Sequence, residues 1–597
     1  MPTKSRFSRC ESGETIASET TRPRGAASAL LHPAAALLSR IAQITEEKLR
    51  KPDGALAAYR EALKLDPTSD LGRVQRHHVG DGSPGSSTMK FGLGQSALRA
   101  EDKRFLRGQG RYTDDINIAG QAYAVMVRSR IAHGLLKVID TKAATTMPGV
   151  LAILTSADLD AAGFGPLKCP MNIPQRDGSP MKTPPRPSLA KGKVRFVGEA
   201  VACVVAETAL QAKDAAEAVE LDIEELPAVT SPAEALAPAA PQIHDDVPGN
   251  LALDFHYGDA EAVKKAFAEA AHVTRLEIVS NRIVVNPMEP RSAIGRFDPA
   301  TGRWTLNVGC QGVIGLRGGL ARDVLGVTPD KLRVLTGNVG GSFGMKSQVY
   351  PEYGPLLLAS KQLGRPVKWT DERSTSFLSD SHGRAQDVHC ELALAADGTF
   401  LGVRVRGYGN LGAYITGVAP GPLSLNTGKN LQSVYKTPLL GIDIKTVLTN
   451  TTLMGAYRGA GRPEANYYME RLIDRAADEM GINRLTLRKR NFIRPAQLPF
   501  AAASGVTYDS GDFQGVFSKA LEISDHANFA RRKKESRKRG KLRGIAVGSY
   551  LEITAPPSAE LGKIVFEADG SVRLITGTLD YGQGHATPFA QVLSSEL

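Results

Sequence analysis

The sequence is poor in the residues that hold metal clusters and disulfide frameworks. It has only five cysteines in 597 residues, and no two of them form a CxxC pair. This scatter argues against a structural zinc site and against an iron–sulfur cluster bound within this chain. A small, odd set of cysteines in so long a chain fits a reducing compartment, so we predict a cytoplasmic protein.

Long hydrophobic runs are also missing. No stretch approaches the roughly 20 apolar residues that a membrane-spanning helix needs. The N-terminal region lacks a clean apolar segment with a cleavage site, and it has no twin arginine. We therefore predict neither a membrane span nor a signal peptide.

Acidic residues are outnumbered by basic ones. Lysine and arginine total 74 against 62 aspartate and glutamate, a net charge of +12. The excess favours anionic partners without choosing among nucleic acid, a phosphate-bearing cofactor and an acidic protein. Residues 531–543 alone hold nine basic residues and one glutamate, a pattern typical of a solvated helix face before a strand. No aromatic residue lies in this run, which weighs against nucleic-acid binding.

Residues 1–88 differ in character from the rest of the chain. Ala55, Tyr59, Ala62 and Pro67 have the spacing of the second helix of a tetratricopeptide repeat, although an ordinary amphipathic helix pair explains the pattern equally well. Residues 79–88 are rich in glycine and serine, as in a flexible linker. We interpret residues 1–88 as a foreign extension, which is a remnant of another gene or the result of a misplaced start.

The following stretch mixes short strands with amphipathic helices. Apolar or alternating runs predict strands at residues 122–128, 150–154, 197–206 and 221–224, and a helix at 209–219. Residues 228–248, rich in proline and alanine, have the composition of an interdomain linker. The pattern predicts an α/β fold of mixed α+β character, and the length allows about four domains.

The stretch most suggestive of chemistry is Gly337–Lys346, which reads GNVGGSFGMK. It follows an apolar run predicted as a strand, residues 332–335, and precedes a predicted helix, residues 353–361. A glycine turn in this position can direct backbone N–H groups at an anion. A plain turn gives the same pattern, so this stretch alone does not identify a site.

Three further stretches fit with this glycine turn, and the four occur in a fixed order along the chain. They are Gly309–Gln311 (GCQ), Met454–Glu464 (MGAYRGAGRPE) and Gly582–Thr587 (GQGHAT). Together with the glycine turn, they resemble the molybdopterin-binding large subunit of the xanthine dehydrogenase / aldehyde oxidase / aerobic carbon monoxide dehydrogenase family. The resemblance covers Met89 to Leu597.

The resemblance implies a domain order. Residues 89–235 are expected to form the family's α/β hammerhead domain, residues 250–495 a first molybdopterin-binding domain, and residues 505–597 the start of a second. Because the chain stops inside the helix that follows the last glycine turn, we expect the last domain to be incomplete. The family's general base, a glutamate, is then expected beyond Leu597, so no residue here is assigned that role.

The resemblance also implies site residues. Gln311 would donate a hydrogen bond to an oxo ligand of molybdenum, and Phe343 and Gly344 would line the metal pocket, with the Gly344 N–H facing the metal's ligands. Arg458 would orient a carbonyl or carboxylate through a forked hydrogen bond. The remaining implied cofactor-binding residues are Gly341, Gln583, Gly584 and His585. No side chain is expected to ligate the metal.

Simpler interpretations of individual residues stay open at this point. Gln311 also fits a satisfied surface amide, and Arg458 a surface salt bridge. Glu289, in the turn Asn286–Arg291, is expected either to bond a neighbouring loop or to pair with Arg291, and pairing is the favoured interpretation.

Two positions depart from the family's best-known members. Purine oxidisers carry a glutamate shortly after the Phe-Gly pair, where this chain has Ser347, so purine hydroxylation is disfavoured. Carbon monoxide oxidisers carry a copper-binding cysteine in the Arg458 loop, where this chain has Gly459. Glycine cannot ligate copper, so carbon monoxide oxidation by that mechanism is disfavoured.

The implied function is hydroxylation of an aldehyde or N-heterocycle, with water as the oxygen source, by a molybdenum–molybdopterin cofactor in its cytosine dinucleotide form. Electrons would pass to separate iron–sulfur (2Fe–2S) and FAD subunits, and a separate C-terminal piece of the large subunit is a further expected partner. Two alternatives are a non-catalytic adaptor built on a degenerate hydroxylase scaffold and a generic phosphate binder. The absence of a P-loop pattern counts against the second alternative.

Overall fold

A computed structural model describes residues 91–552 and 562–596. They divide into two compact units, one of residues 99–552 and 576–586, and a smaller one of residues 91–98, 562–575 and 587–596. The predicted extension of residues 1–88 lies outside the described residues. Within the described ranges, no helix combines the length and apolar character needed to cross a membrane.

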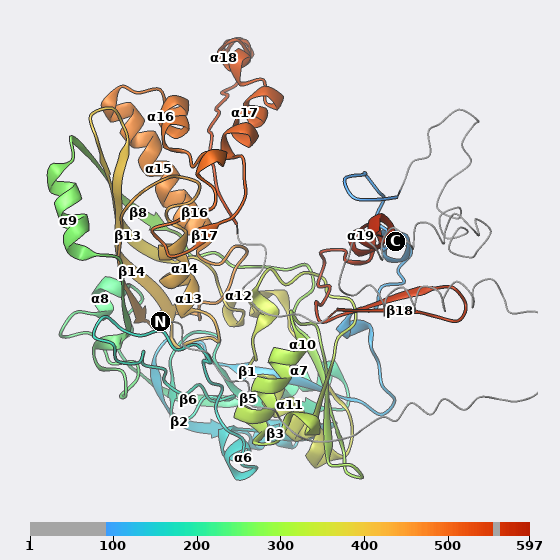
Figure 1. Ribbon diagram of the computed structural model, residues 1–597. Helices are drawn as coiled ribbons and strands as arrows, with labels where there is room; N and C mark the ends of the chain where they lie inside the picture. Colours follow the sequence, from blue (N-terminus) through green and yellow to red (C-terminus); the bar gives the residue numbers. More distant parts are fainter. Residues whose placement is uncertain (1–90, 553–561, 597) are drawn as a thin grey trace, which may run out of the picture. The chain divides into compact units, whose positions relative to one another are not determined.

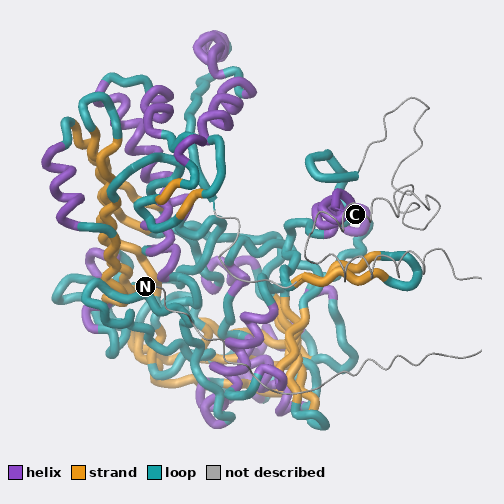
Figure 2. The backbone as a smooth tube through the Cα atoms, in the orientation of Figure 1, coloured by secondary structure: helices purple, strands orange, loops and turns teal. Residues whose placement is uncertain are grey.

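A seven-stranded mixed sheet forms one core of the larger unit (Figures 1 and 2). The pairs β10–β11 and β1–β12 are parallel, and the other neighbours are antiparallel. Both predicted domains contribute strands to this one sheet, four neighbouring strands from the predicted cofactor-binding domain and three from the predicted hammerhead domain, so the expected boundary between them does not separate two cores. In spatial order the strands are β11 (Leu332–Leu335), β10 (Arg303–Val308), β9 (Ser292–Asp298), β12 (Val367–Thr370), β1 (Ala122–Arg128), β5 (Ala200–Ala206) and β3 (Val150–Leu154).

Helices cover both faces of this sheet because successive strand residues point to opposite sides. On β5, Ala202 and Val204 pack with α7 (Ala209–Glu217). Cys203 and Val205 belong to the cluster that contains α11 (Tyr353–Leu363). The uninterrupted apolar run of β5 is therefore explained by burial on two sides.

A five-stranded sheet forms the second core of the larger unit. Helix α15 (Arg462–Met480) packs on β8 and β13, and α9 (Ala260–Glu269) packs against β14 on the opposite face (Figure 1). Only β14 and β15 pair in parallel. The spatial order is β7 (Leu251–Tyr257), β15 (Leu440–Leu448), β14 (Phe400–Gly412), β13 (Gln386–Leu394) and β8 (His272–Ser280).

Smaller elements complete the larger unit. A three-stranded sheet has the order β4 (Lys193–Val194), β2 (Gly134–Asp140) and β6 (Glu220–Glu225), and β16 (Phe500–Ala501) pairs with β17 (Thr507–Tyr508). The other helices are α4 (Asp102–Phe105), α5 (Lys142–Thr145), α6 (Ser156–Ala161), α8 (Pro232–Ala235), α10 (Val313–Gly319), α12 (Arg373–Ser379), α13 (Pro420–Leu423), α14 (Leu425–Asn430), α16 (Arg484–Asn491), α17 (Phe513–Ile523) and α18 (Phe529–Lys538).

Most of the predicted elements are confirmed, with small shifts at their ends. The predicted strands at 122–128 and 150–154 match β1 and β3, and the predicted helix at 353–361 is α11. The prediction of a linker at 228–248 is wrong. Ala235, Ile243 and Val247 are fully buried in the core of the five-stranded sheet, so this stretch packs as part of the domain despite its composition.

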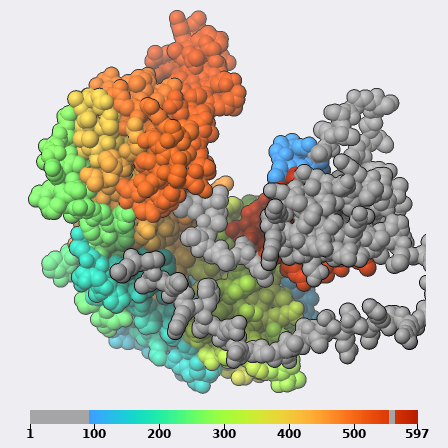
Figure 3. Space-filling model, viewed as in Figure 1, coloured from blue at the N-terminus to red at the C-terminus, as the bar shows by residue number. Residues whose placement is uncertain are grey.

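The basic run forms α18, which stands with α17 at the edge of the larger unit (red-orange in Figure 3). No strand follows it within residues 541–552, contrary to expectation. In the smaller unit, β18 (Gly562–Phe566) and β19 (Val572–Thr576) form a hairpin, and α19 (Ala586–Glu596) binds residues 92–95 through Gln591 and Ser595.

Candidate active site

Gln311 sits where β10 ends, in the turn that leads into α10. Its backbone N–H donates to the Lys346 carbonyl (3.0 Å). Its side-chain oxygen accepts from the Ser342 hydroxyl (2.6 Å) and from the Gly344 N–H (2.8 Å). Because a backbone N–H can only donate, the amide must present its oxygen to the glycine turn and its NH₂ group away from it.

The glycine turn itself has an unusual backbone. Phe343 adopts a φ of +51° and leaves 43% of its surface exposed, a conformation that only surrounding contacts sustain in a bulky residue. Gly344 has a φ of +99°, and a Cβ there would lie 2.6 Å from the Ala456 carbonyl oxygen. No other residue fits at position 344 without displacing the neighbouring loop.

That neighbouring loop, residues 455–461, carries Arg458. The Arg458 N–H donates to the Phe343 carbonyl (2.9 Å), and its guanidinium carbon lies 5.7 Å from the centre of the Phe343 ring. Arg384 fixes the loop from behind by donating to the carbonyls of Tyr457 (3.0 Å) and Arg458 (2.9 Å). Among the described residues, the Arg458 guanidinium has no hydrogen-bond acceptor and no ion-pair partner, so its donors are available to a ligand.

A buried ion pair supports the turn from below. Lys346, 2% exposed, donates to the Glu289 carboxylate (2.8 Å) and carbonyl (2.9 Å). The same carboxylate accepts from the Gly340 N–H (2.8 Å). Burial lowers the pKa of Lys346, and the negative charge of Glu289 opposes that effect. The favoured pairing of Glu289 with Arg291 is therefore wrong, and the open alternative, a bond to a neighbouring loop, is confirmed.

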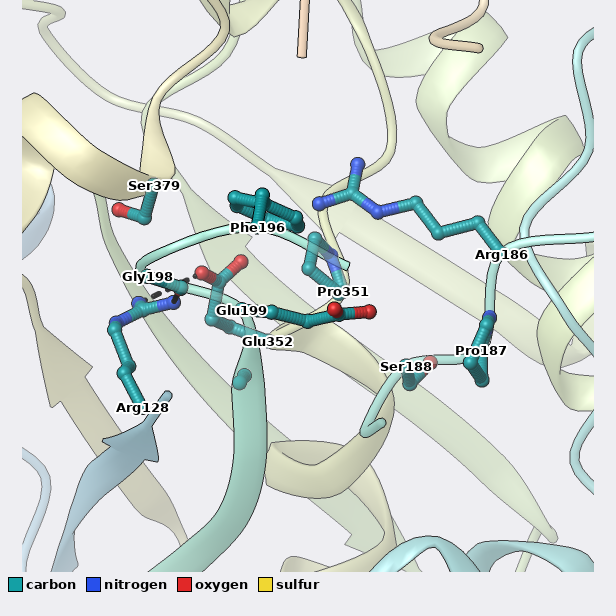
Figure 4. A pocket seen from close by; sticks show the side chains of 11 residues that line it. Arg128, Arg186, Pro187, Ser188, Phe196, Gly198, Glu199, Pro351, Glu352 and Ser379 are labelled. Atoms are coloured by element: carbon teal, nitrogen blue, oxygen red, sulfur yellow. Dashed lines mark hydrogen bonds and ion pairs between the residues drawn. The ribbon is translucent and has the colours of Figure 1, made fainter. Parts of the chain in front are cut away.

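Arg291 instead belongs to a buried network around Glu352, of which Figure 4 shows Arg128, Glu352 and Ser379. It donates to Glu352 (2.7 Å) and Asp380 (2.5 Å), and Arg128 donates to Glu352 (2.9 Å). Burial disfavours the Glu352 carboxylate, but the two arginines outweigh it and hold its pKa well below the usual range. The network joins β1, α11 and the end of α12, and an adjoining cavity lined by Arg186 and Ser188 has room for about one water molecule.

The turn at residues 580–585 is organised by its own aspartate. The Asp580 carboxylate accepts from the N–H groups of Gly582 (2.9 Å), Gly584 (3.2 Å) and His585 (3.0 Å). Burial alone would raise the pKa of Asp580, but these three donors lower it. These three N–H groups already donate to Asp580, so they are not available to an external anion as the glycine turn predicted.

The structure brings the predicted residues together only in part. Gln311, Phe343, Gly344 and Arg458 form one connected cluster, with Gly341 in the same turn. The Gly344 N–H, expected to face the ligands of molybdenum, donates to Gln311 instead. Gln583 turns its side chain back to the N–H of Tyr581 (2.7 Å).

Sequence reasoning missed the residues that position this cluster. Ser342, Lys346 and Tyr581 contact the predicted residues, yet only Ser342 and Lys346 carried a signal, because they flank Phe343 and Gly344 in the same turn. Within residues 91–552 and 562–596, no group of three or more His, Cys, Asp or Glu side chains is placed to hold a metal ion.

Models of protein families match three stretches of this chain. Residues 243–492 and 519–597 match models of the molybdopterin cofactor-binding domain, and residues 107–227 match the a/b hammerhead domain of aldehyde oxidase and xanthine dehydrogenase. The chain belongs to the xanthine dehydrogenase, aldehyde oxidase and carbon monoxide dehydrogenase large-subunit family. The domain order and the mixed α/β class expected from the sequence are those of this family.

Individual relatives are similar over most of this chain. The nicotine 6-hydroxylase large subunit of Paenarthrobacter nicotinovorans is 32% identical over 85% of this chain and 62% of its own length. The carbon monoxide dehydrogenase large chain of Hydrogenophaga pseudoflava is 33% identical over 85% of this chain and 65% of its own. The crystal structure of quinoline 2-oxidoreductase from Pseudomonas putida 86 superposes with a TM-score of 0.78, at 31% identity, over 83% of this chain and 64% of that one. The chain thus spans less than two thirds of these relatives.

The two departures from family members have structural reasons. The Ser347 hydroxyl donates to the Gly344 carbonyl (2.6 Å), so it is committed to the turn. Gly459 has a φ of +87°, and a Cβ there would lie 2.5 Å from the Pro463 ring. A cysteine at position 459 would therefore be strained and would collide with the start of α15.

Proposed function

We propose that this chain is the large-subunit portion of a molybdenum hydroxylase that oxidises an N-heterocycle or an aldehyde. The observation that carries the proposal is the cluster of Gln311, Phe343, Gly344 and Arg458. Three separate loops meet there through the Gly344–Gln311 and Arg458–Phe343 hydrogen bonds, and within the described residues the Arg458 guanidinium, near the Phe343 ring, keeps its N–H donors. Such convergence of polar donors over an aromatic side chain is typical of a ligand site.

The residues fit a molybdopterin cofactor by their chemistry. The Gln311 NH₂ is directed away from the glycine turn, and an amide donates to an oxo group without adding charge. Gly344 leaves the turn without a Cβ, so the loop that carries Arg458 can pack closely against the turn. When bound, the cofactor would supply the two-electron oxidation and the transfer of a water-derived oxygen. We propose the cytosine dinucleotide form, following the resemblance.

The chain's own residues would bind and orient the substrate. Arg458, without an anionic partner in the described part of the chain, would hold a carboxylate by two parallel N–H donors, or a carbonyl or ring nitrogen by a single one. Phe343 would stack against a planar substrate. No residue of this chain is assigned the general base.

Two observations narrow the range of possible substrates. Gly459 and the adjacent Pro463 leave no room for a copper-binding cysteine, which weighs against carbon monoxide. Ser347 offers no carboxylate for a purine. Because relatives are a nicotine 6-hydroxylase and a quinoline 2-oxidoreductase, N-heterocycles are the first class to test.

We propose that electrons leave through separate iron–sulfur and FAD subunits. Relatives are named as large subunits or as a subunit of a complex, which supports a multi-subunit enzyme. A cytoplasmic location is part of the same proposal and is supported by the scattered free cysteines.

The test is oxidation of a panel of N-heterocycles and aldehydes in ¹⁸O-labelled water, with an artificial electron acceptor. The chain would be produced together with the products of the genes on either side of its own. Incorporation of one ¹⁸O atom into a hydroxylated product supports the proposal. Turnover without label from water, or no turnover by a complex that contains molybdenum, would refute it.

A further inference from the structure

Tyr581 links the turn at 580–585 to the cluster around Gln311. The Gln311 NH₂ donates to the Tyr581 hydroxyl at 3.1 Å, and both residues lie in the larger unit. This uses one of the two amide hydrogens of Gln311. The other hydrogen remains for a ligand.

The bond is one step in a chain of hydrogen bonds with a single direction. Ser342 and Gly344 donate to the oxygen of Gln311, and the nitrogen of Gln311 donates to Tyr581. A phenol hydroxyl that accepts a hydrogen bond still has its own hydrogen to donate. Among the described residues, no acceptor for the Tyr581 O–H is found, so the chain of bonds ends in a free donor beside the Gln311 NH₂.

The backbone of Tyr581 is held in place. Its N–H donates to the Gln583 side chain (2.7 Å), and Asp580 ties the three following N–H donors of the turn. Leu579 packs against the core of the seven-stranded sheet. The hydroxyl is therefore delivered to Gln311 by a rigid turn, which is what positioning of a donor requires.

We propose that Tyr581 is a positioning residue for Gln311: its hydroxyl fixes the Gln311 NH₂ so that the second amide hydrogen and the phenol O–H point together at the oxygen or sulfur ligands of a bound molybdenum cofactor. This inference rests on the proposed function for its ligand. The hydrogen-bond chain itself does not, and the two parts can be tested separately.

The first arm uses the full chain alone, labelled with 3-fluorotyrosine and observed by ¹⁹F NMR. The Tyr581 signal is the one lost in Tyr581→Phe. Gln311→Glu keeps the side-chain shape but reverses the bond, because a carboxylate accepts only. The titration midpoint of the Tyr581 signal should then rise by about one pH unit, a tenfold shift of its ionisation.

The chain offers a matched control for this arm. Gln121 donates to the Tyr123 hydroxyl at 3.0 Å, which is the same type of bond at a site outside the cluster. Gln121→Glu should move the Tyr123 signal and leave that of Tyr581 unchanged. A Tyr581 midpoint that Gln311→Glu does not change would overturn the hydrogen-bond chain.

The second arm measures molybdenum per chain, and the EPR spectrum of its Mo(V) state, in the complex formed with the flanking gene products. Loss of one positioned hydrogen bond predicts about fivefold less retained molybdenum in Tyr581→Phe, with unchanged melting temperature, and altered EPR g-values in the loaded fraction. A purely structural role would leave the EPR spectrum unchanged. Equal molybdenum content with an identical spectrum overturns the positioning role. A wild-type complex without molybdenum instead refutes the proposed function, and the role of Tyr581 toward a cofactor falls with it.

Discussion

Arg458 differs from the other arginines near the site because no carboxylate in the described part of the chain neutralises it. Arg291 and Arg128 share Glu352, and Arg384 pairs with Glu464. A guanidinium left unpaired over an aromatic ring keeps its donors for a ligand. At the scale of single residues, this contrast is the best indication of where a substrate binds.

We expect Arg458→Ala to reduce kcat/KM roughly 10²–10³-fold in the assembled enzyme, because a charge-assisted donor to the reacting substrate is lost. The kcat/KM of Arg458→Lys should lie between those of the wild-type and Arg458→Ala, since a lysine ammonium keeps the charge but cannot form two parallel hydrogen bonds. Arg471, 5.7 Å from the Tyr467 ring, provides the matched control, and Arg471→Ala should stay close to wild-type. Steady-state kinetics on the three variants check this. Wild-type kcat/KM in Arg458→Ala would contradict the assignment.

His382 predicts a pH dependence of stability at the base of the Arg458 loop. Its carbonyl accepts from the Gly455 N–H, and burial together with the charge of Arg282 lowers its pKa from 6.5 to about 4. The unfolded chain takes up this proton below pH 6.5, whereas the folded chain resists uptake until about pH 4. The contribution is present above pH 6.5 and is lost as pH falls toward 4, by up to about 3 kcal/mol.

We therefore expect the melting temperature of His382→Gln to fall less than that of the wild-type between neutral and mildly acidic pH. His526→Gln, a change in a short helical turn at the surface, should follow the wild-type curve. Calorimetry across this pH range measures the difference. Parallel curves for wild-type and His382→Gln would show that the ring does not titrate as its environment predicts.

At the scale of elements, the buried ion network connects the hammerhead strands to the cofactor-binding strands. Glu352 is fully buried and receives Arg291, 61 residues away, and Arg128, 224 residues away. Long sequence separation makes the network a tie between parts of the fold that local structure does not connect.

Removing one member should be costly. Glu352→Gln leaves two buried arginines without their shared carboxylate, so we expect a loss of about 3–5 kcal/mol in the free energy of unfolding. The surface pair Arg531–Glu535 is the comparison, and Glu535→Gln should cost less than about 1 kcal/mol. Chemical denaturation measures both. Equal losses would mean that the buried network contributes no more than a surface pair.

The elements also show what could be read from the sequence. Strands β1 and β3 and helix α11 follow from apolar runs bounded by turn residues, because local periodicity reports burial directly. The shared seven-stranded sheet does not follow, since β1 pairs with β12 through residues as far apart in sequence as Ala122 and Val367. The packed stretch 228–248 was also unpredictable, because its proline and alanine composition matches both a linker and a core-lining segment.

The same limit applies to the site. Gln311, Phe343, Gly344 and Arg458 could be selected because the stretches that contain them resemble, in order, those of the family. The partners of Lys346 and the contact of Tyr581 depend on side chains that folding brings together, so no spacing in the sequence predicts them. The donors of the turn at 580–585 also could not be assigned, because Asp580 competes for them with any external anion.

At the scale of the whole molecule, we propose that the loops at residues 309–312, 340–347 and 455–461 form one surface for a molybdopterin cofactor. The Gly344 backbone is where two of these loops touch, and it tolerates no side chain. A Cβ there displaces residues 455–461, and with them Arg458.

The most direct test is the molybdenum and pterin content per chain, for the wild-type, Gly344→Ala and Gly364→Ala, each produced with the flanking gene products. Gly364 has a φ of +66° with open space around it, so its substitution also places an alanine at positive φ but causes no collision. We predict molybdenum and a pterin dinucleotide in the wild-type and in Gly364→Ala, and at least tenfold less in Gly344→Ala, a loss of about 1.4 kcal/mol or more in binding. A folded wild-type chain without molybdenum in every pairing, or full occupancy in Gly344→Ala, would contradict the account.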